Sequence, residues 1–386
     1  MKITGVEPLL CEGYYQNWVF VKVTTDEGLV GWGDATDFPG EPIIAEAVRY
    51  LARYVVGESP LNIEKVWNKM YFGMYSTGKT INGAITGIET ALWDILGKVA
   101  GLPVYQLLGG CREKVRLYVH CDAFEEGDKL DMVARKAKRV VKEGFTCIKT
   151  HPSQLGTWKR SVVRLNRQMD PETLRCTVDK VQAIRETIGA DMDLCIDLNG
   201  LLNVPSAIKL GRALEPYDLL FFEDPIPQRE GSENLRRVKR DIKTPMCVGE
   251  ILYNVYEFKQ ILEADAVDLI HPDVVHCGGL SQAKKIAALA EAYNVPMALH
   301  NLNSPLSTLI SAHFAAGIPN FLIMEFTHPD VPWRDKVISE PLKVEHGYLE
   351  LPQRPGFGVE IVEEEVAKHP YRIHERCTWI SEFQVV

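Results

Sequence analysis

The second half of the chain alternates short apolar runs with segments of helical spacing. Each run ends in a polar side chain that could take part in chemistry, and in order these are Asp197, Glu223, Glu250, Asp273, His300 and Glu325. Successive positions are separated by 23 to 27 residues, which is the length of one strand, one loop and one helix. Continuous apolar runs of this length are typical of parallel strands buried on both faces.

Two further apolar runs lie upstream, at 115–122 and 145–152, on either side of a charged helical segment at 128–144. Together, the runs between Val115 and Phe326 predict eight strands, which is enough to close a (β/α)8 barrel. In such barrels the active site is built at the carboxyl ends of the strands. The polar side chains that end the runs are therefore predicted to meet at one mouth of the barrel.

The chain has 386 residues and is longer than the roughly 250 of a bare barrel, so a second element is expected. Residues 1–114 alternate in strand-like fashion and then become helical, which predicts an α+β domain with a hairpin turn at Asp26-Glu27-Gly28. We place the barrel at 115–354. Residues 355–386 are predicted to return and complete the N-terminal domain.

Composition narrows the class of partner. The net charge is −9 and no basic run occurs, which argues against a nucleic-acid or anionic-membrane partner and favours a small molecule. The nine cysteines are scattered without a CxxC pair, as expected in a reducing cytosol. No signal-like start and no apolar run of membrane-spanning length are present, so we expect a soluble cytoplasmic protein.

Three of the strand-end acids suggest a metal site. Asp197, Glu223 and Glu250 end consecutive strands, and neighbouring strands lie about 4.8 Å apart. Three such anions repel one another unless a cation is present, and a set of hard oxygen ligands favours Mg²⁺ over zinc. The alternative is that each acid forms an ion pair with a nearby Lys or Arg. Three acids at equivalent positions of consecutive strands favour the metal site over this alternative.

Candidate bases lie on both sides of these acids. Asp273 and His300 end the next two strands, where the Asp can fix the tautomer of the His. Lys149 and His151 alternate along an earlier strand, so their side chains share one face. A nearby cation is expected to lower the pKa of Lys149. In the alternative view, His300 and His151 are structural and Lys149 lies on the surface.

Glu325 ends the last strand, where neighbouring carboxylates could keep it protonated as a hydrogen-bond donor. It could equally be the structural partner of an Arg. A cation between bases on two sides suits removal of the proton next to a carboxylate, because the metal stabilises the enediolate. A second acid can then expel a β-hydroxyl as water or return the proton to the opposite face.

These motifs, in this order, resemble the mandelate racemase subgroup of the enolase superfamily over the whole chain. The resemblance rests on seven motifs, and residues 84–110 and 355–361 are similar to its capping domain and C-terminal return. It implies Mg²⁺ bound by Asp197, Glu223 and Glu250, and an acid/base dyad of Asp273 and His300. It also implies a cap that selects substrate through loops near 14–18 and 71–79, and a homo-oligomer, either dimer or octamer.

Within the subgroup, the chain is most similar to sugar-acid dehydratases of the galactonate type. Two departures stand out. The usual Lys-x-Lys is Lys149-Thr-His151, and the catalytic His expected two residues after the first metal ligand is Asn199. We hypothesise that His151 replaces the missing acid. Residues assigned to substrate binding are Asn199, Tyr14, Asn17, Trp18 and Tyr75.

The predicted function is therefore Mg²⁺-dependent dehydration of an aldonic or aldaric acid to a 2-keto-3-deoxy product. A racemase or epimerase using the same residues is the nearest alternative, followed by a lactonising cycloisomerase. A catalytically inactive barrel kept for binding or regulation is the alternative of a different class. Retention of three metal ligands together with the dyad speaks against it.

Overall fold

The N-terminal part of the chain is a three-stranded antiparallel sheet covered by helices. β1 (Ile3–Glu12), β2 (Asn17–Thr25) and β3 (Val30–Asp34) lie in this order, and β2 and β3 are joined by the expected hairpin. The helices that follow are α1 (Glu41–Val55), α2 (Ile63–Gly73) and α3 (Lys79–Ala100). The computed structural model describes residues 1–14, 16–36, 40–75, 78–122, 129–152, 167–327 and 330–373.

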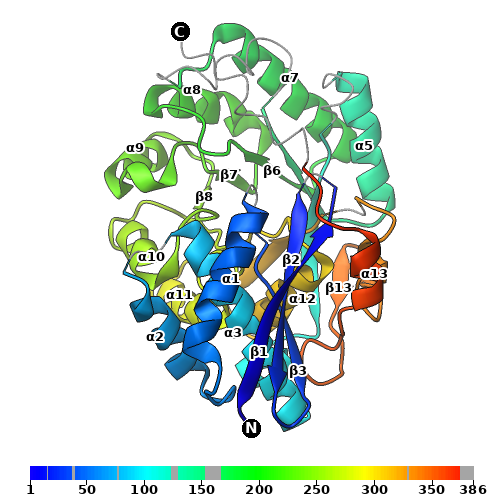
Figure 1. Ribbon diagram of the computed structural model, residues 1–386. Helices are drawn as coiled ribbons and strands as arrows, with labels where there is room; N and C mark the ends of the chain where they lie inside the picture. The colour runs from blue at the N-terminus through cyan, green and yellow to red at the C-terminus, as the bar shows by residue number, and fades with distance from the viewer. Residues whose placement is uncertain are drawn as a thin grey trace.

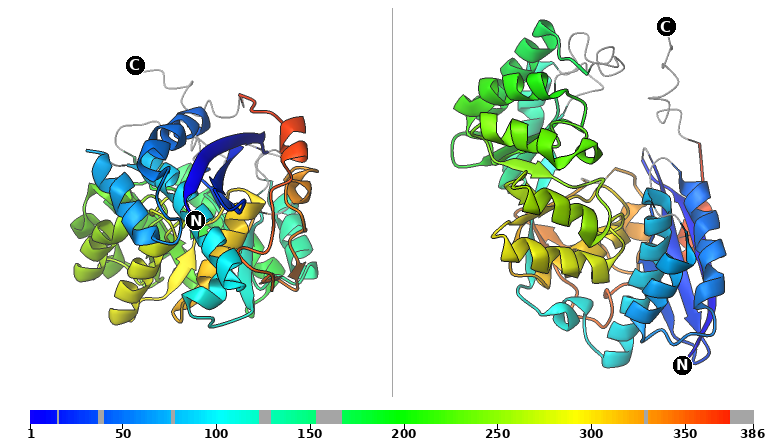
Figure 2. Two further views of the ribbon diagram at one scale, coloured as in Figure 1. Left: turned by 60° about the horizontal axis from the view of Figure 1, so that its bottom comes forward. Right: turned by 90° about the vertical axis from the view of Figure 1, so that its left-hand side faces the viewer.

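The backbones of β3 and α3 pack closely because glycines line their contact. A Cβ added to Gly33 would lie 2.0 Å from the carbonyl oxygen of Gly87, and one added to Gly31 would lie 2.2 Å from that of Ala91. Helix α3 therefore packs directly against the sheet, and most of its residues between Asn82 and Gly97 are buried. In Figures 1 and 2, α3 lies between the sheet and the barrel, where it contacts α11.

Eight parallel strands form a closed barrel. In sequence order they are β4 (Lys114–His120), β5 (Cys147–Thr150), β6 (Asp193–Asp197), β7 (Phe221–Glu223), β8 (Met246–Val248), β9 (Leu269–Ile270), β10 (Met297–Leu299) and β11 (Phe321–Glu325). Each strand pairs with the next one along the chain, and β11 pairs with β4. The strands coincide with the predicted runs, apart from Lys114 at the start of β4, so the prediction of a (β/α)8 barrel is confirmed.

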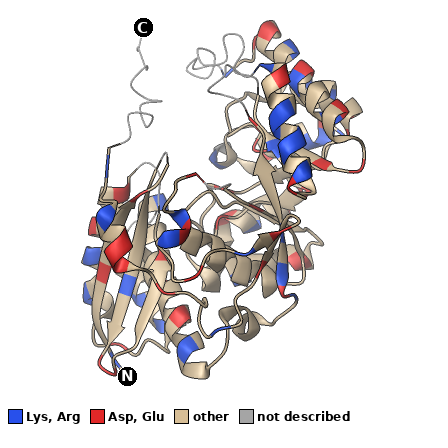
Figure 3. Cartoon of the chain, turned by 90° about the vertical axis from the view of Figure 1, so that its right-hand side faces the viewer, with Lys and Arg blue, Asp and Glu red and all other residues tan. Residues whose placement is uncertain are grey.

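Helices surround these strands and separate them along the chain. They are α5 (Leu130–Lys142), α7 (Pro171–Ile188), α8 (Val204–Leu214), α9 (Ser232–Asp241), α10 (Asn254–Glu263), α11 (Leu280–Ala292) and α12 (Pro305–Ala316). The short helix α4 (Val104–Leu108) leads into the barrel, and the 3-10 turns are η2 (Glu215–Tyr217), η3 (Gln228–Glu230) and η4 (Arg334–Lys336). Figure 3 shows residues of both charge signs over the outer helices.

The floor of the barrel is filled by one side chain from each strand. These are Tyr118, Cys147, Cys195, Phe221, Cys247, Leu269, Ala298 and Ile323, all buried in one cluster. Three of the cysteines thus serve as small apolar residues in the barrel core, as buried thiols often do. Because side chains alternate along a strand, the residues two positions further on point into the barrel just above this floor.

The C-terminal segment returns to the N-terminal domain. β13 (Tyr348–Glu350) pairs antiparallel with β4, and β12 (Val344–Glu345) pairs antiparallel with β13. α13 (Glu363–Lys368) contacts β1. The backbone N–H of Phe357 donates to Asp94 at 2.9 Å, and Trp32 Nε1 donates to Glu360 at 2.8 Å. The predicted fold class, with a cap completed by the C-terminal segment, is confirmed, whereas the residue boundaries assigned to the domains stay a prediction. Among the described residues, no helix is both long and apolar enough to cross a bilayer.

Candidate active site

The layer above the barrel floor is polar. Two positions beyond the floor residues stand His120, Lys149, Asp197, Glu223, His271, His300 and Glu325. On β8 the equivalent position is Gly249, with φ 148°, and the carboxylate is supplied by the next residue, Glu250. The strand period therefore explains why residues far apart in sequence converge at the carboxyl ends of the strands.

Asp197, Glu223 and Glu250 converge as predicted. Each offers one carboxylate oxygen, and the three oxygens lie within 4.8 Å of one another. Burial, with further repulsion from Asp197 and Glu223, raises the pKa of Glu250, although His300 opposes the shift. The negative charge of the triad is thus incompletely compensated on this side.

Two buried oxygens beside the triad lack hydrogen-bond donors. Glu223 Oε2 and Asp224 Oδ1 are inaccessible to solvent and accept no hydrogen bond from the described residues. Burial, followed by the charges of Glu250 and Glu223, raises the pKa of Asp224 well above its ordinary value. Unsatisfied carboxylate oxygens in a buried acidic cluster fit a hard divalent cation, so this donor set could hold a metal ion.

Lys149 lies at the centre of the acids. Its Nζ is 2.6 Å from Glu325 Oε1, 2.8 Å from Glu223 Oε1 and 3.4 Å from Asp197 Oδ2. Burial disfavours the ammonium, but Glu223 and Glu325 outweigh it, and the pKa of Lys149 lies well above its ordinary value. The residues around Lys149 therefore do not lower its pKa. The lower pKa expected from the sequence would require a bound cation.

His300 and Asp273 form the predicted pair. His300 Nδ1 is 2.6 Å from Asp273 Oδ2, and its Nε2 faces Glu250 Oε2 at 3.3 Å. Burial lowers the pKa of His300, but Glu325, Asp273 and Glu250 raise it to about 10. The ring is thus oriented by one carboxylate and turns its other nitrogen toward the triad.

A second pair of the same kind lies on the opposite side of the triad. His151 Nδ1 is 2.8 Å from Asp122 Oδ2, and its Nε2 is 3.3 Å from Asp197 Oδ2. Burial lowers the pKa of His151, but Asp122 and Asp197 raise it to about 10. Asp122 is also bound by Lys180 Nζ at 2.7 Å.

Asp122 was not predicted from the sequence. It follows the first barrel strand, one strand before His151, just as Asp273 precedes His300 by one strand. The separations along the chain, 29 and 27 residues, are nearly equal. This parallel spacing is the signal that could have identified Asp122.

Glu325 differs from the expectation. Its Oε1 is 2.5 Å from His120 Nε2 and also binds Lys149, whereas no Arg is among these partners. Burial favours the protonated form, but Lys149, His300 and His120 outweigh it, and the pKa of Glu325 lies well below its ordinary value. These surroundings favour the ionised form of Glu325, whereas the sequence suggested a protonated acid, and the role of Glu325 in the reaction stays a prediction.

Asn199 supports Asp197, a candidate metal ligand. Its Nδ2 donates to Asp197 Oδ2 at 3.0 Å and its backbone N–H donates to Asp197 Oδ1 at 2.8 Å. Its φ of 49° lies in the left-handed region, which Asn tolerates better than most residues. The structure thus places Asn199 at the site as a brace of Asp197, and its contact with substrate stays a prediction.

The cap residues proposed for substrate binding separate into two groups. Asn17 and Trp18 are buried in β2, where Asn17 Nδ2 donates to the carbonyl of Arg372 and Trp18 packs in the core. Trp18 Nε1 has no hydrogen-bond partner among the described residues. The assignment of Asn17 and Trp18 to substrate binding stays a prediction. Tyr14 and Tyr75 are exposed, so their assignment stays a prediction. Residues 15, 76 and 77 of these loops lie outside the described residues.

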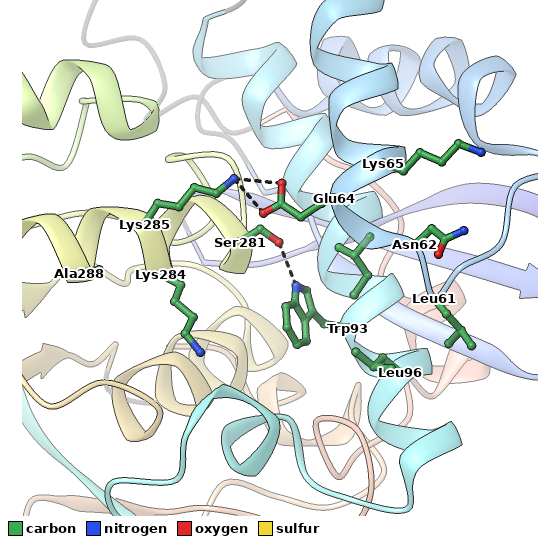
Figure 4. A pocket seen from close by; sticks show the side chains of 11 residues that line it. Leu61, Asn62, Glu64, Lys65, Trp93, Leu96, Ser281, Lys284, Lys285 and Ala288 are labelled. Atoms are coloured by element: carbon green, nitrogen blue, oxygen red, sulfur yellow. Dashed lines mark hydrogen bonds and ion pairs between the residues drawn. The ribbon is translucent and has the colours of Figure 1, made fainter.

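Another cavity lies on the outside of the molecule, between the cap and α11 (Figure 4). It encloses about 800 Å³ and is far less acidic than the barrel mouth. Its Lys285 pairs with Glu64 at 2.8 Å, and its Lys65 pairs with Glu58 at 2.7 Å. The cavity contains none of the converging groups described above, so the barrel mouth is the better candidate for chemistry.

A capped barrel with three carboxylates at its mouth defines an enolase-type enzyme. Residues 13–109 match the mandelate racemase / muconate lactonizing enzyme N-terminal domain, and residues 132–366 match the enolase C-terminal domain-like family. The chain therefore belongs to the mandelate racemase / muconate lactonizing enzyme family of the enolase superfamily. The predicted resemblance is confirmed.

Relatives of the chain include two named dehydratases. A D-xylonate dehydratase of Haloferax volcanii is 34% identical, with 95% of this chain and 89% of the relative covered. A D-galactonate dehydratase of Cronobacter sakazakii is also 34% identical, with 90% of each covered. The crystal structure of a mandelate racemase/muconate lactonizing enzyme from Sulfitobacter sp. superposes with a TM-score of 0.90 at 33% identity, covering 97% of this chain and 96% of that one.

Proposed function

We propose that the protein is a Mg²⁺-dependent hydro-lyase that dehydrates an aldonic or aldaric acid of the galactonate type to a 2-keto-3-deoxy acid. The observation that carries the proposal is the pair of Asp–His units on opposite sides of three carboxylates that could hold a metal ion. The two relatives named as sugar-acid dehydratases support the reaction and the substrate class. A cytoplasmic homo-oligomer remains part of this proposal.

Asp197, Glu223 and Glu250 would hold the cation, with Asn199 keeping Asp197 in place. A bound Mg²⁺ would supply charge stabilisation for the enediolate that forms when the proton next to the carboxylate leaves. Lys149 lies among the same acids and would contribute a second positive charge beside the substrate carboxylate. The chain thus concentrates positive charge where the substrate becomes more negative.

The two histidines would divide the proton transfers. His300 and His151 each turn Nε2 toward the triad from opposite sides, while an Asp holds Nδ1. One imidazole in its neutral form takes the C2 proton, and the electron pair moves through the enediolate to break the C3–O bond. The other, as imidazolium, protonates the departing hydroxyl, which leaves as water. The enol product takes a proton at C3 and becomes the 2-keto acid.

The same two-sided arrangement would also serve a racemase or epimerase, and product analysis separates the reactions. The purified protein is incubated with a panel of aldonic and aldaric acids, with Mg²⁺ or with a chelator, in D₂O. A Mg²⁺-dependent 2-keto-3-deoxy product supports the proposal. Deuterium at C2 without loss of water would indicate epimerisation, and a lactone product would indicate cycloisomerisation.

A non-catalytic binding barrel would behave differently in the same assay. Such a protein would bind Mg²⁺ tightly yet turn over none of the acids. Glu223→Gln serves as the matched control for metal binding, because it removes one anionic ligand and nearly preserves the side-chain shape. Turnover and Mg²⁺ affinity should fall together in this variant, whereas retained Mg²⁺ affinity would contradict the assignment of Glu223.

A further inference from the structure

His276 lies between the cap and the acid/base pair, and no step of the proposed reaction uses it. It stands in the loop after β9, three residues beyond Asp273, and is buried. Its Nε2 is 3.3 Å from the carbonyl oxygen of Thr36, which belongs to the cap. Its Nδ1 is 3.4 Å from Asp273 Oδ2, the same oxygen that holds His300.

Both ring nitrogens of His276 therefore face oxygen acceptors. A carbonyl and a carboxylate can only accept, so the ring satisfies both contacts when it donates from both nitrogens. A donor from His276 and a donor from His300 then share one carboxylate oxygen. Asp273 Oδ1 also accepts the backbone N–H groups of Val275 at 2.7 Å and His276 at 3.3 Å, so the His276 ring is one of several groups that set where Asp273 Oδ2 meets His300.

Thr36, the cap residue that His276 contacts, is held in place by hydrogen bonds. Thr36 Oγ1 accepts a hydrogen bond from the N–H of Val19 in β2 at 3.0 Å, and the N–H of Thr36 donates to Asp34 at 2.8 Å. Asp34 in turn binds Ser304, which caps the N-terminus of α12 four residues after His300. The cap therefore holds the loops after β9 and β10 together.

Two more cap residues grip the loop that contains His276. Trp67 Nε1 donates to the carbonyl of Gly278 at 2.8 Å, and Glu89 accepts the N–H groups of Leu280 and Ser281. These contacts hold the end of the loop that leads into α11. His276 differs from them because its ring contacts Asp273. A displacement of the cap at Thr36 would reach the pair through His276.

We propose that His276 is a positioning residue that couples the placement of the cap to the Asp273–His300 pair. Its Nε2–H holds the backbone of the cap at Thr36, and its Nδ1–H holds the Asp273 oxygen that orients His300. The proposal deepens the proposed function and rests on it only for the kinetic part of the test. The hydrogen bond between His300 and Asp273 can be observed without any substrate.

Two substitutions separate the two ends of the connection. In His276→Asn the amide replaces Nδ1, so the contact with Asp273 is kept and that with Thr36 is lost. In His276→Gln the amide replaces Nε2, so the contact with Thr36 is kept and that with Asp273 is lost. His276→Leu removes both. His313→Asn changes a buried histidine elsewhere in the barrel wall and is the control.

The first measurement is the downfield proton resonance of the His300 Nδ1–H, recorded with Mg²⁺ and without substrate and assigned by its loss in His300→Asn. We expect it to shift in His276→Gln and His276→Leu, and to stay close to the wild-type position in His276→Asn and His313→Asn. An unchanged resonance in folded His276→Leu, with folding checked by thermal unfolding, would overturn the proposal. This outcome does not depend on whether sugar acids are turned over.

The second measurement is steady-state kinetics on the sugar acid identified by product analysis. We expect His276→Gln to lower kcat about tenfold with little change in KM, because the pair is misplaced. His276→Asn should raise KM about fivefold with kcat nearly kept, because only the cap is released. Identical kinetic changes in both variants would overturn the two-sided role, even where the resonance shifts.

Discussion

The barrel mouth has two Asp–His pairs, and they differ in what holds the aspartate. On one side Asp273 follows β9 and His300 follows β10, and on the other Asp122 follows β4 and His151 follows β5. The three strands that carry the candidate metal ligands lie between them. The local device is the same in both, since an Asp on one strand binds Nδ1 of a His on the next.

The anchors behind the two aspartates come from different parts of the molecule. Asp122 is bound by Lys180 of α7, which belongs to the barrel. Asp273 faces His276, which in turn contacts the cap. The Asp122–His151 pair is therefore held by barrel residues, whereas the Asp273–His300 pair also reaches the cap through His276. We expect changes in the cap to affect His300 more than His151.

The largest effect is expected from His300→Asn, which removes the imidazole of the cap-linked pair. General acid–base groups contribute about 10²- to 10⁴-fold, so kcat should fall by about that factor. Mg²⁺ affinity, measured by calorimetry, should stay near the wild-type value because no metal ligand is lost. If kcat falls less in His300→Asn than in His151→Ala, the His151 pair contributes more to the reaction than the His300 pair, contrary to this prediction.

A change behind the other pair tests its anchor. Lys180→Met leaves the buried Asp122 carboxylate without its ammonium partner, and breaking a buried pair in this way costs about 3 kcal/mol of unfolding free energy. Lys259→Met, which breaks an exposed pair with Glu263, should cost at most about 0.5 kcal/mol. Urea unfolding measures both. Equal losses would mean that Lys180 does not support Asp122.

The sequence predicted the cap-linked pair more fully than the barrel-anchored one. Asp273 and His300 could be recognised because both end apolar runs within a regular series. Asp122 ends the first run of the barrel, before the series becomes visible, and its partner His151 was assigned without it. The eight strands were predictable for the same reason as His300, because period and apolar runs are local properties of the chain.

Contacts between the domains were not predictable from the sequence. Asn17 and Trp18 belong to the loop near 14–18 that was expected to select the substrate, but whether the end of a strand is buried depends on how the cap packs on the barrel. The charge of Glu325 likewise depends on Lys149 and His120, which come from two other strands. The burial of Asn17 and Trp18 and the charge of Glu325 both depend on contacts between segments that are far apart in the sequence, and no local sequence pattern predicts such contacts.

The role of the barrel-anchored pair is tested by His151→Ala. If His151 is the second acid, kcat should fall about tenfold or more, and Asp122→Asn should produce part of the same fall because it acts through His151. The double variant should then be no slower than His151→Ala alone. A fall of about threefold or less in His151→Ala, under ~1 kcal/mol in barrier, would assign this side to Lys149 alone.

The smallest effect concerns His313, a buried histidine whose ring has no ion pair with a carboxylate in the described part of the chain. Burial lowers the pKa of His313 to about 3, whereas the two paired histidines have a pKa raised to about 10. Because the folded pKa lies below the ordinary 6.5, the unfolded chain takes up the proton first, and stability falls as pH drops from 6.5 toward 3.

Between pH 7 and pH 6 this loss should stay under about 1 kcal/mol. His313→Asn can still accept the N–H of Tyr105, which His313 Nδ1 accepts at 3.0 Å, but it cannot titrate. The unfolding free energy of this variant should therefore fall less steeply between pH 7 and pH 6 than that of the wild type. Equal slopes of unfolding free energy against pH in the two proteins would mean that burial does not keep His313 neutral. The raised pKa of His151 and His300 could then not be credited to their aspartates acting against burial.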